Sequence, residues 1–211
     1  MKPEYKLPFF RFLDGQFQLQ ELEQWIYRTP DLQDDLGEIV YFELIEFNFK
    51  DKYSERLLAE LVLNKIVAEG EFLTWKITER LKGFIATPEE IIDRLNEFYA
   101  LYSNAYNSRG EMAPGFKFLQ NLGLNYLYWM DEGYLKTHYG NEWQAEYKIF
   151  KKELPFYHEQ LKPVAKLILQ ALEDKTIEIF KQGDYVMTDT LRKKLESDTL
   201  FRIVHDSANK D

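Results

Sequence analysis

The sequence predicts a mainly α-helical protein, a bundle-like arrangement of several helices with one small β-hairpin near the C-terminus. Apolar residues recur at intervals of three and four along most of the chain, in windows too long for buried strands. Residues that begin and end helices separate these windows. Residues 176–187 differ, because β-branched and aromatic residues there flank a Gly-containing turn.

The chain opens with short helices. Apolar residues within 19–26 share one helical face. Thr29 and Pro30 then predict an N-cap followed by proline at the first helical position, and Gly37 predicts the end of that next helix. Two short helices joined by a tight turn are therefore expected.

Longer helices follow. Residues 39–49 fit either a buried helix or a strand, and helix is the interpretation we adopt. Residues 51–66 carry one apolar stripe with acidic residues early and a base late, which favours a helix through its dipole. A second stripe spans 72–86, and residues 87–90, Thr-Pro-Glu-Glu, predict a new helix that begins with a capping box.

The helical spacing resumes over residues 91–106 and stops at a polar stretch, 107–115, which predicts a long loop. This loop suggests an N-terminal helical lobe over 1–107 and a C-terminal lobe over 116–206 that contains the hairpin 176–187. One continuous domain over both lobes is the other interpretation.

The C-terminal half contains further breaks. Residues 116–123 predict a short helix, and Gly140 precedes another apolar stripe. Residues 164–172 are helical in pattern, whereas Pro155 and Pro163 are expected to kink or segment the chain around them.

Charge and composition exclude several classes of protein. The formal net charge is −9 and the pI is about 5.0, so the chain lacks the positive field that binding to nucleic acid or to anionic lipid requires. No apolar run approaches the length of a transmembrane helix, and the N-terminal residues, with an acid among them and no apolar region after them, predict no signal peptide. With no cysteine in the chain, a cytoplasmic location is expected, although a lack of cysteine also suits a secreted bacterial protein.

Catalytic motifs are missing from the sequence. His138, His158 and His205 lack a glutamate three residues earlier, so the Glu-x-x-His spacing of helical metal sites does not occur. The chain has no cysteine nucleophile, no Gly-x-Ser-x-Gly elbow and no glycine-rich phosphate loop. We therefore expect no catalytic residues, metal or cofactor; the enzyme alternative is a cleft between the lobes lined by carboxylates.

The acidic residues are unevenly distributed. Residues 12–49 hold nine acids and a single base, Arg28, so they carry −8 of the net charge of −9. A concentrated negative field attracts a basic partner, although acids also favour the first turns of short helices without binding anything. Tyr27 and Tyr41 lie among these acids and are typical interface residues, whereas Trp25 and Phe42 are expected in the core.

Aromatic and glycine positions in six segments resemble those of bacterial immunity proteins of polymorphic toxin systems: residues 9–15, 22–27, 32–37, 41–49, 98–102 and 118–126. The resemblance implies stoichiometric occlusion of a toxin domain, with no catalytic residues. A basic toxin would suit the acidic segment. The predicted partner-binding residues are Tyr27, Asp31, Asp34, Asp35, Glu38, Tyr41, Glu43 and Glu46. A helical adaptor with an exposed apolar patch is the remaining alternative.

Overall fold

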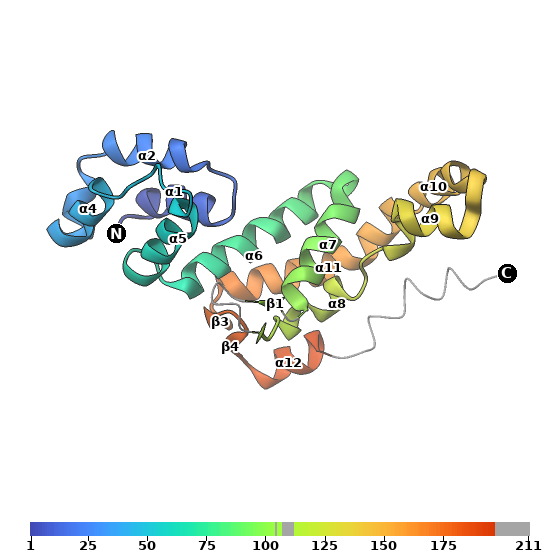
Figure 1. Ribbon diagram of the computed structural model, residues 1–211. Helices are drawn as coiled ribbons and strands as arrows, with labels where there is room; N and C mark the ends of the chain where they lie inside the picture. The colour runs from blue at the N-terminus through green and yellow to red at the C-terminus, as the bar shows by residue number, and fades with distance from the viewer. Residues whose placement is uncertain (104, 107–111, 197–211) are drawn as a thin grey trace. The chain divides into compact units, whose positions relative to one another are not determined.

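The computed structural model describes residues 1–103, 105–106 and 112–196 and confirms the mainly α-helical fold (Figure 1). The chain forms two compact units, Met1–Lys76 and Ile77–Asp211, called here the N-terminal and C-terminal units. This division falls inside a helix, α6, and not in the polar stretch 107–115. The predicted lobes, 1–107 and 116–206, stay a prediction about folding units, and residues 197–206 lie outside the described part of the chain.

The N-terminal unit consists of helices packed on an aromatic core. Its elements are α1 (Pro3–Leu13), α2 (Leu19–Tyr27), α3 (Leu32–Leu36), α4 (Glu38–Ile45), α5 (Ser54–Lys65) and the start of α6 (Glu69–Ala86). The buried ring of Phe9 lies edge-on to Trp25, with ring centroids 5.3 Å apart, and Phe10 contacts Trp75 at 5.5 Å. These contacts join α1 to α2 and to α6, so the first helix organises the unit.

The junction between α2 and α3 corrects one expectation. α3 begins at Leu32, not at Pro30. The Thr29 hydroxyl donates back to the Trp25 carbonyl at 2.8 Å, so it extends the end of α2 and does not cap α3. Gly37, at φ +77°, ends α3 as predicted, and residues 39–49 are helical only as far as Ile45.

The C-terminal unit continues from α6 through helices, short 3₁₀ turns and two small hairpins. Its helices are α7 (Ile91–Tyr102), α8 (Gln120–Gly123), α9 (Glu132–Tyr139), α10 (Trp143–Lys151), α11 (Leu154–Glu173) and α12 (Asp189–Leu195). Its 3₁₀ turns are η1 (Pro88–Glu90), η2 (Lys117–Leu119), η3 (Tyr128–Met130) and η4 (Gly140–Glu142). Its strands are β1 (Ala105–Tyr106), β2 (Met112–Ala113), β3 (Ile177–Lys181) and β4 (Asp184–Met187).

Two details of α7 differ from the prediction. Thr87 makes no side-chain capping bond, and the 3₁₀ turn η1 leads into the helix. α7 ends at Tyr102, because the following residues leave the helix and pair as β1 with β2. The chain then returns close to the end of α7, where the Phe116 amide donates to the Leu101 carbonyl at 3.0 Å. The predicted helix over 91–106 was therefore too long.

The long helix α11 overturns the expected break at Pro163. α11 runs through Pro163 without interruption, and Pro155 lies in its first turn, where proline is tolerated. One face of α11 is buried along its whole length, from Leu154 to Leu172. Packing of this face outweighs the one backbone hydrogen bond that Pro163 removes.

The predicted hairpin over 176–187 is confirmed. β3 and β4 pair antiparallel, with a register irregularity between Ile179 and Lys181. Gly183 makes the turn at φ +71°, and a Cβ placed on it would lie 2.4 Å from atoms of Pro114. The turn therefore requires glycine for its backbone angle and for its close approach to another segment.

Candidate partner-binding surface

All eight predicted partner-binding residues lie in the N-terminal unit, between the end of α2 and the residue after α4. α3 and α4 contact each other, and α2 contacts α4. Gly37 separates α3 from α4, so the acids from 31 to 38 do not form one continuous helical stripe. The fold nevertheless gathers these residues on neighbouring elements.

Two of the predicted acids already have internal partners. Glu43 accepts two hydrogen bonds from the Lys65 ammonium, at 2.6 and 2.7 Å, which joins α4 to α5. Asp35 accepts a hydrogen bond from the backbone amide of Lys2. Both carboxylates therefore contribute to contacts within the unit, and the ion pair with Lys65 partly neutralises the charge of Glu43.

The other four acids, Asp31, Asp34, Glu38 and Glu46, form what we call the acidic surface. All four are exposed, and none has an ion-pair partner among the residues that the structure describes. Asp31 occupies the N-cap position of α3 without a side-chain capping bond. The acidic surface is the part of the predicted site whose charge remains available.

Helix dipoles explain some of these acids but not all of them. Glu38 lies in the first turn of α4, where the positive end of the dipole stabilises a carboxylate. Glu46 lies at the C-cap of the same helix, where the dipole is negative, and the last turn of α4 has no basic residue. The dipole of α4 therefore disfavours a negative charge at Glu46, and stabilisation of the helix does not explain why an acid occupies this position.

The two predicted tyrosines differ in their surroundings. Tyr27 is 50% exposed, its ring lies edge-on to Phe49, and its hydroxyl donates to the Ile45 carbonyl at 3.3 Å. Tyr41 is half-buried beside Phe42, with ring centroids 6.2 Å apart. Tyr27 thus links the end of α2 to the end of α4 and still presents half of its surface to solvent.

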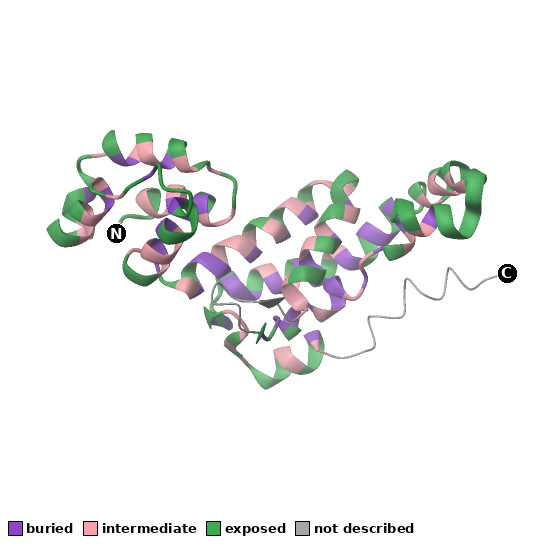
Figure 2. Ribbon diagram, viewed as in Figure 1, coloured by how far each residue is buried: buried purple, intermediate pink, exposed green. Residues whose placement is uncertain are grey.

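Two apolar residues of α4 were missed by the sequence analysis. Ile39 is 78% exposed and Phe42 is 47% exposed, so the expectation that Phe42 lies in the core was wrong. Leu44 is the buried residue of α4, and Figure 2 shows most of the helix as exposed or intermediate. Residues on every side of α4 are apolar, so periodicity could not indicate which side is covered. Apolar residues on all sides of so short a helix were the sequence signal that could have indicated an exposed apolar surface.

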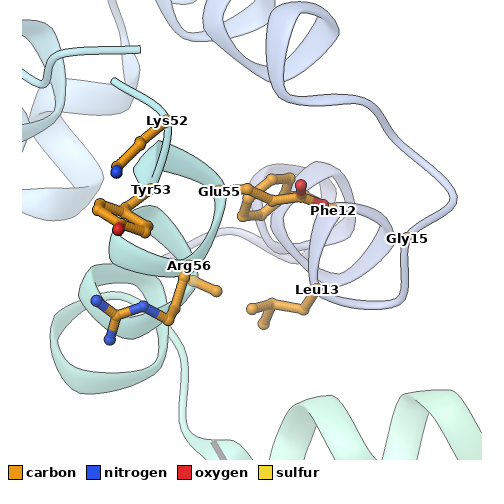
Figure 3. Close-up of a pocket in the computed structure, with 8 residues that line it drawn as sticks. Phe12, Leu13, Gly15, Lys52, Tyr53, Glu55 and Arg56 are labelled. Carbon is orange, nitrogen blue, oxygen red and sulfur yellow. The ribbon is translucent and has the colours of Figure 1, made fainter. Parts of the chain in front are cut away.

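A shallow hollow of about 420 Å³ opens elsewhere in this unit, between the end of α1 and the start of α5 (Figure 3). Its cations are already engaged: Lys52 lies 4.5 Å from the centre of the Tyr53 ring, and Arg56 pairs with Glu60 at 2.8 Å. Glu55 adds a negative charge to the same rim. The hollow therefore offers no concentrated charge of one sign for a ligand.

Two observations bear on metal and acid–base chemistry. Within residues 1–103, 105–106 and 112–196, no three His, Asp or Glu side chains could share a metal ion. A hydrogen bond and positive charge from Lys162 lower the pKa of Glu159, which is opposite to the shift that a general acid needs. In the same part of the chain, no helix is long and apolar enough to cross a membrane.

Comparison with known proteins gives no relative: no protein-family model, no curated protein and no solved structure matches this chain. The surface of α3 and α4 is therefore the feature of this chain that bears on its function.

Proposed function

We propose that this chain is a non-catalytic binding protein, an immunity protein of the bacterial cytoplasm that occludes a basic toxin domain. The observation that carries the proposal is the acidic surface: four exposed carboxylates that have no ion-pair partner among the described residues, in or at the ends of two contacting helices. The resemblance of the aromatic and glycine positions to immunity proteins supports the same interpretation.

The proposed mechanism is binding without turnover. The negative field of residues 12–49 accelerates the encounter with a positively charged partner, and this acceleration weakens as salt rises. After docking, the carboxylates take the place of phosphate groups that a basic nuclease would bind, and the bound protein blocks access to the toxin's active site. Tyr27 and Tyr41 border the docked surface.

Affinity capture from the host lysate tests this function. A tagged wild-type chain is expected to retain one basic protein at near-equal amount. A variant with Asp31→Asn, Asp34→Asn, Glu38→Gln and Glu46→Gln is expected to lose it. The matched control replaces four exposed acids of the C-terminal unit, Asp93→Asn, Glu142→Gln, Glu173→Gln and Glu178→Gln, which alters the net charge equally.

The captured protein is then expressed alone and together with each variant. Immunity requires that the captured protein arrests growth, that the wild-type chain and the control variant restore growth, and that the acidic-surface variant does not. Equal rescue by both variants would rule out the acidic surface as the binding site.

A helical adaptor is the second candidate, because Ile39 and Phe42 expose apolar surface on α4. An adaptor would retain a partner that has no toxicity of its own. The growth assay therefore separates the two candidates even when both use the same surface.

A further inference from the structure

We infer that Ile39 and Phe42, called here the apolar pair, are the energetic anchor of the partner surface and receive an amphipathic basic helix of the partner. This inference rests on the proposed function, since it concerns the same face. It adds the residues that supply affinity and the kind of element that they bind.

The apolar pair lies on a helix in which only one of the apolar residues is fully buried. α4 has eight residues and buries only Leu44, although most of its residues are apolar. Ile39 and Phe42 are three positions apart, so their side chains are neighbours on one ridge. A single exposed apolar residue needs no explanation, whereas two adjacent ones on a helix without a polar face indicate a surface that another molecule covers.

The secondary structure of the N-terminal unit limits how a partner can bind. Residues 1–76, all of which the structure describes, contain no β-strand, so no sheet edge is available for an added strand. An exposed ridge of i and i+3 side chains instead packs into the groove between side-chain rows of a second helix. A helix is therefore the element that fits α4.

The charges around the ridge specify a basic helix. Glu38 precedes the apolar pair and Glu46 follows it, so carboxylates stand at both ends of α4. Asp34 lies on α3, which contacts α4, and Asp31 is the N-cap residue of α3. Lysine or arginine on the flanks of an amphipathic helix would pair with these acids, and a positive charge at Glu46 would also offset the negative end of the α4 dipole. Apolar anchors surrounded by polar residues are typical of binding hot spots.

A synthetic helix tests the inference without the natural partner. The probe is a labelled 14-residue peptide of leucine and lysine, with leucine at helical spacing and lysine elsewhere, and the reference probe replaces every lysine with glutamate. Fluorescence anisotropy measures binding to the full chain at about 0.05 M and about 0.3 M salt. The wild-type chain is expected to bind the lysine peptide and not to bind the glutamate peptide.

Two double variants locate the anchor. Ile39→Ser with Phe42→Ser is expected to weaken lysine-peptide binding about tenfold or more, because both apolar contacts are lost. Ile149→Ser with Phe156→Ser removes side chains that are 50% and 56% exposed in the C-terminal unit, and is expected to leave binding unchanged. Circular dichroism checks that both variants keep the wild-type helix content.

The outcomes separate this inference from the proposed function. Equal binding by the wild type and the Ile39→Ser, Phe42→Ser variant would overturn the apolar anchor. If neutralising the acidic surface abolished binding while the Ile39→Ser, Phe42→Ser variant bound like the wild type, the acidic partner site would remain and the apolar anchor would fail. Failure of the wild type to bind the lysine peptide would also overturn the inference. So would a wild-type dimer that Ile39→Ser dissociates in light scattering, since a second copy would then cover the ridge.

Discussion

The ammonium of Lys65 donates to both carboxylate oxygens of Glu43, at 2.6 and 2.7 Å, and so ties α5 to α4. Glu46, three residues later, has no such partner in the described chain. Two acids of one predicted site therefore differ in kind: Glu43 stabilises the fold, and the charge of Glu46 faces outward.

This difference gives a first prediction. Glu43→Gln is expected to lower the free energy of unfolding by up to about 1 kcal/mol, because the pair is partly exposed. The loss should fade in about 1 M salt, which screens the pair. Glu46→Gln should cost nothing, because it removes a negative charge from the end of α4. Urea denaturation measures both, and equal losses would contradict the distinction.

A second prediction compares the two sides of α4. Leu44 is fully buried, so Leu44→Ala should cost about 2–5 kcal/mol of stability through lost packing and the cavity left behind. Ile39 is 78% exposed, so Ile39→Ala should change stability by no more than about 0.5 kcal/mol. Denaturant midpoints of the two variants make the comparison. A large loss for Ile39→Ala would mean that α4 is covered within the chain.

Gly115 provides a third prediction, about the segment that follows β2. A Cβ at this position would lie 1.8 Å from the carbonyl oxygen of Tyr102, so Gly115→Ala must displace backbone and should cost about 1–3 kcal/mol. Gly83→Ala is the control. Its Cβ would lie 3.2 Å from the Arg94 guanidinium, which Glu90 and Glu97 hold, so the small shift required of Arg94 offsets the helix preference of alanine, up to about 1 kcal/mol. Thermal melts should show a clearly larger drop for Gly115→Ala than for Gly83→Ala, and equal drops would contradict the backbone clash.

Tyr185 gives a prediction about alkaline pH. Burial, followed by the charge of Glu196, raises the pKa of Tyr185 to about 12, above the value of about 10 expected when unfolded. The folded chain thus holds the phenol proton more tightly. The protonated Tyr185 phenol therefore contributes fully to the free energy of unfolding below pH of about 10, and this contribution is lost as pH rises toward about 12.

Tyr185→Phe is the matched variant, because it removes the titrating group and its 3.1 Å hydrogen bond to Glu196. Urea unfolding of both proteins should show the advantage of the wild type shrinking between pH of about 10 and about 12. Parallel curves over this range would exclude Tyr185 as the source of alkaline sensitivity.

Local signals predicted the turns and ends that depend on a few adjacent residues. Gly37 and Gly183 both adopt positive φ where the sequence places a helix end and a hairpin turn. Thr29 and Pro30 are residue types that commonly begin a helix, but the Thr29 hydroxyl donates a hydrogen bond to the Trp25 carbonyl of the preceding helix. Capping motifs identify residues that can bond the backbone without fixing which end of a helix they serve.

Tertiary packing decided what the local signals could not. Pro163 did not break α11, because the buried face extends past it on both sides. Tyr106 continued the apolar spacing of α7, yet β1 pairs with β2 at that point. The first difference arises from packing against other segments and the second from backbone pairing with the neighbouring strand β2, and intrinsic preferences encode neither.

The partner surface was only partly predictable for a related reason. Charge counting grouped the acids by their place in the sequence, but it could not separate Glu43, which pairs with Lys65, from Glu46. Phe42 was assigned to the core because large apolar residues are usually buried. Which side of an apolar helix stays uncovered depends on how many neighbours the fold supplies.

Gly183 limits the evolution of its hairpin. Asparagine and aspartate commonly replace glycine at positive φ, so most turns of this kind tolerate drift. Here any Cβ would also meet Pro114 at 2.4 Å, which removes those two substitutes. A substitution of Gly183 therefore requires a second substitution beforehand, one that moves the segment around Pro114 away from the turn.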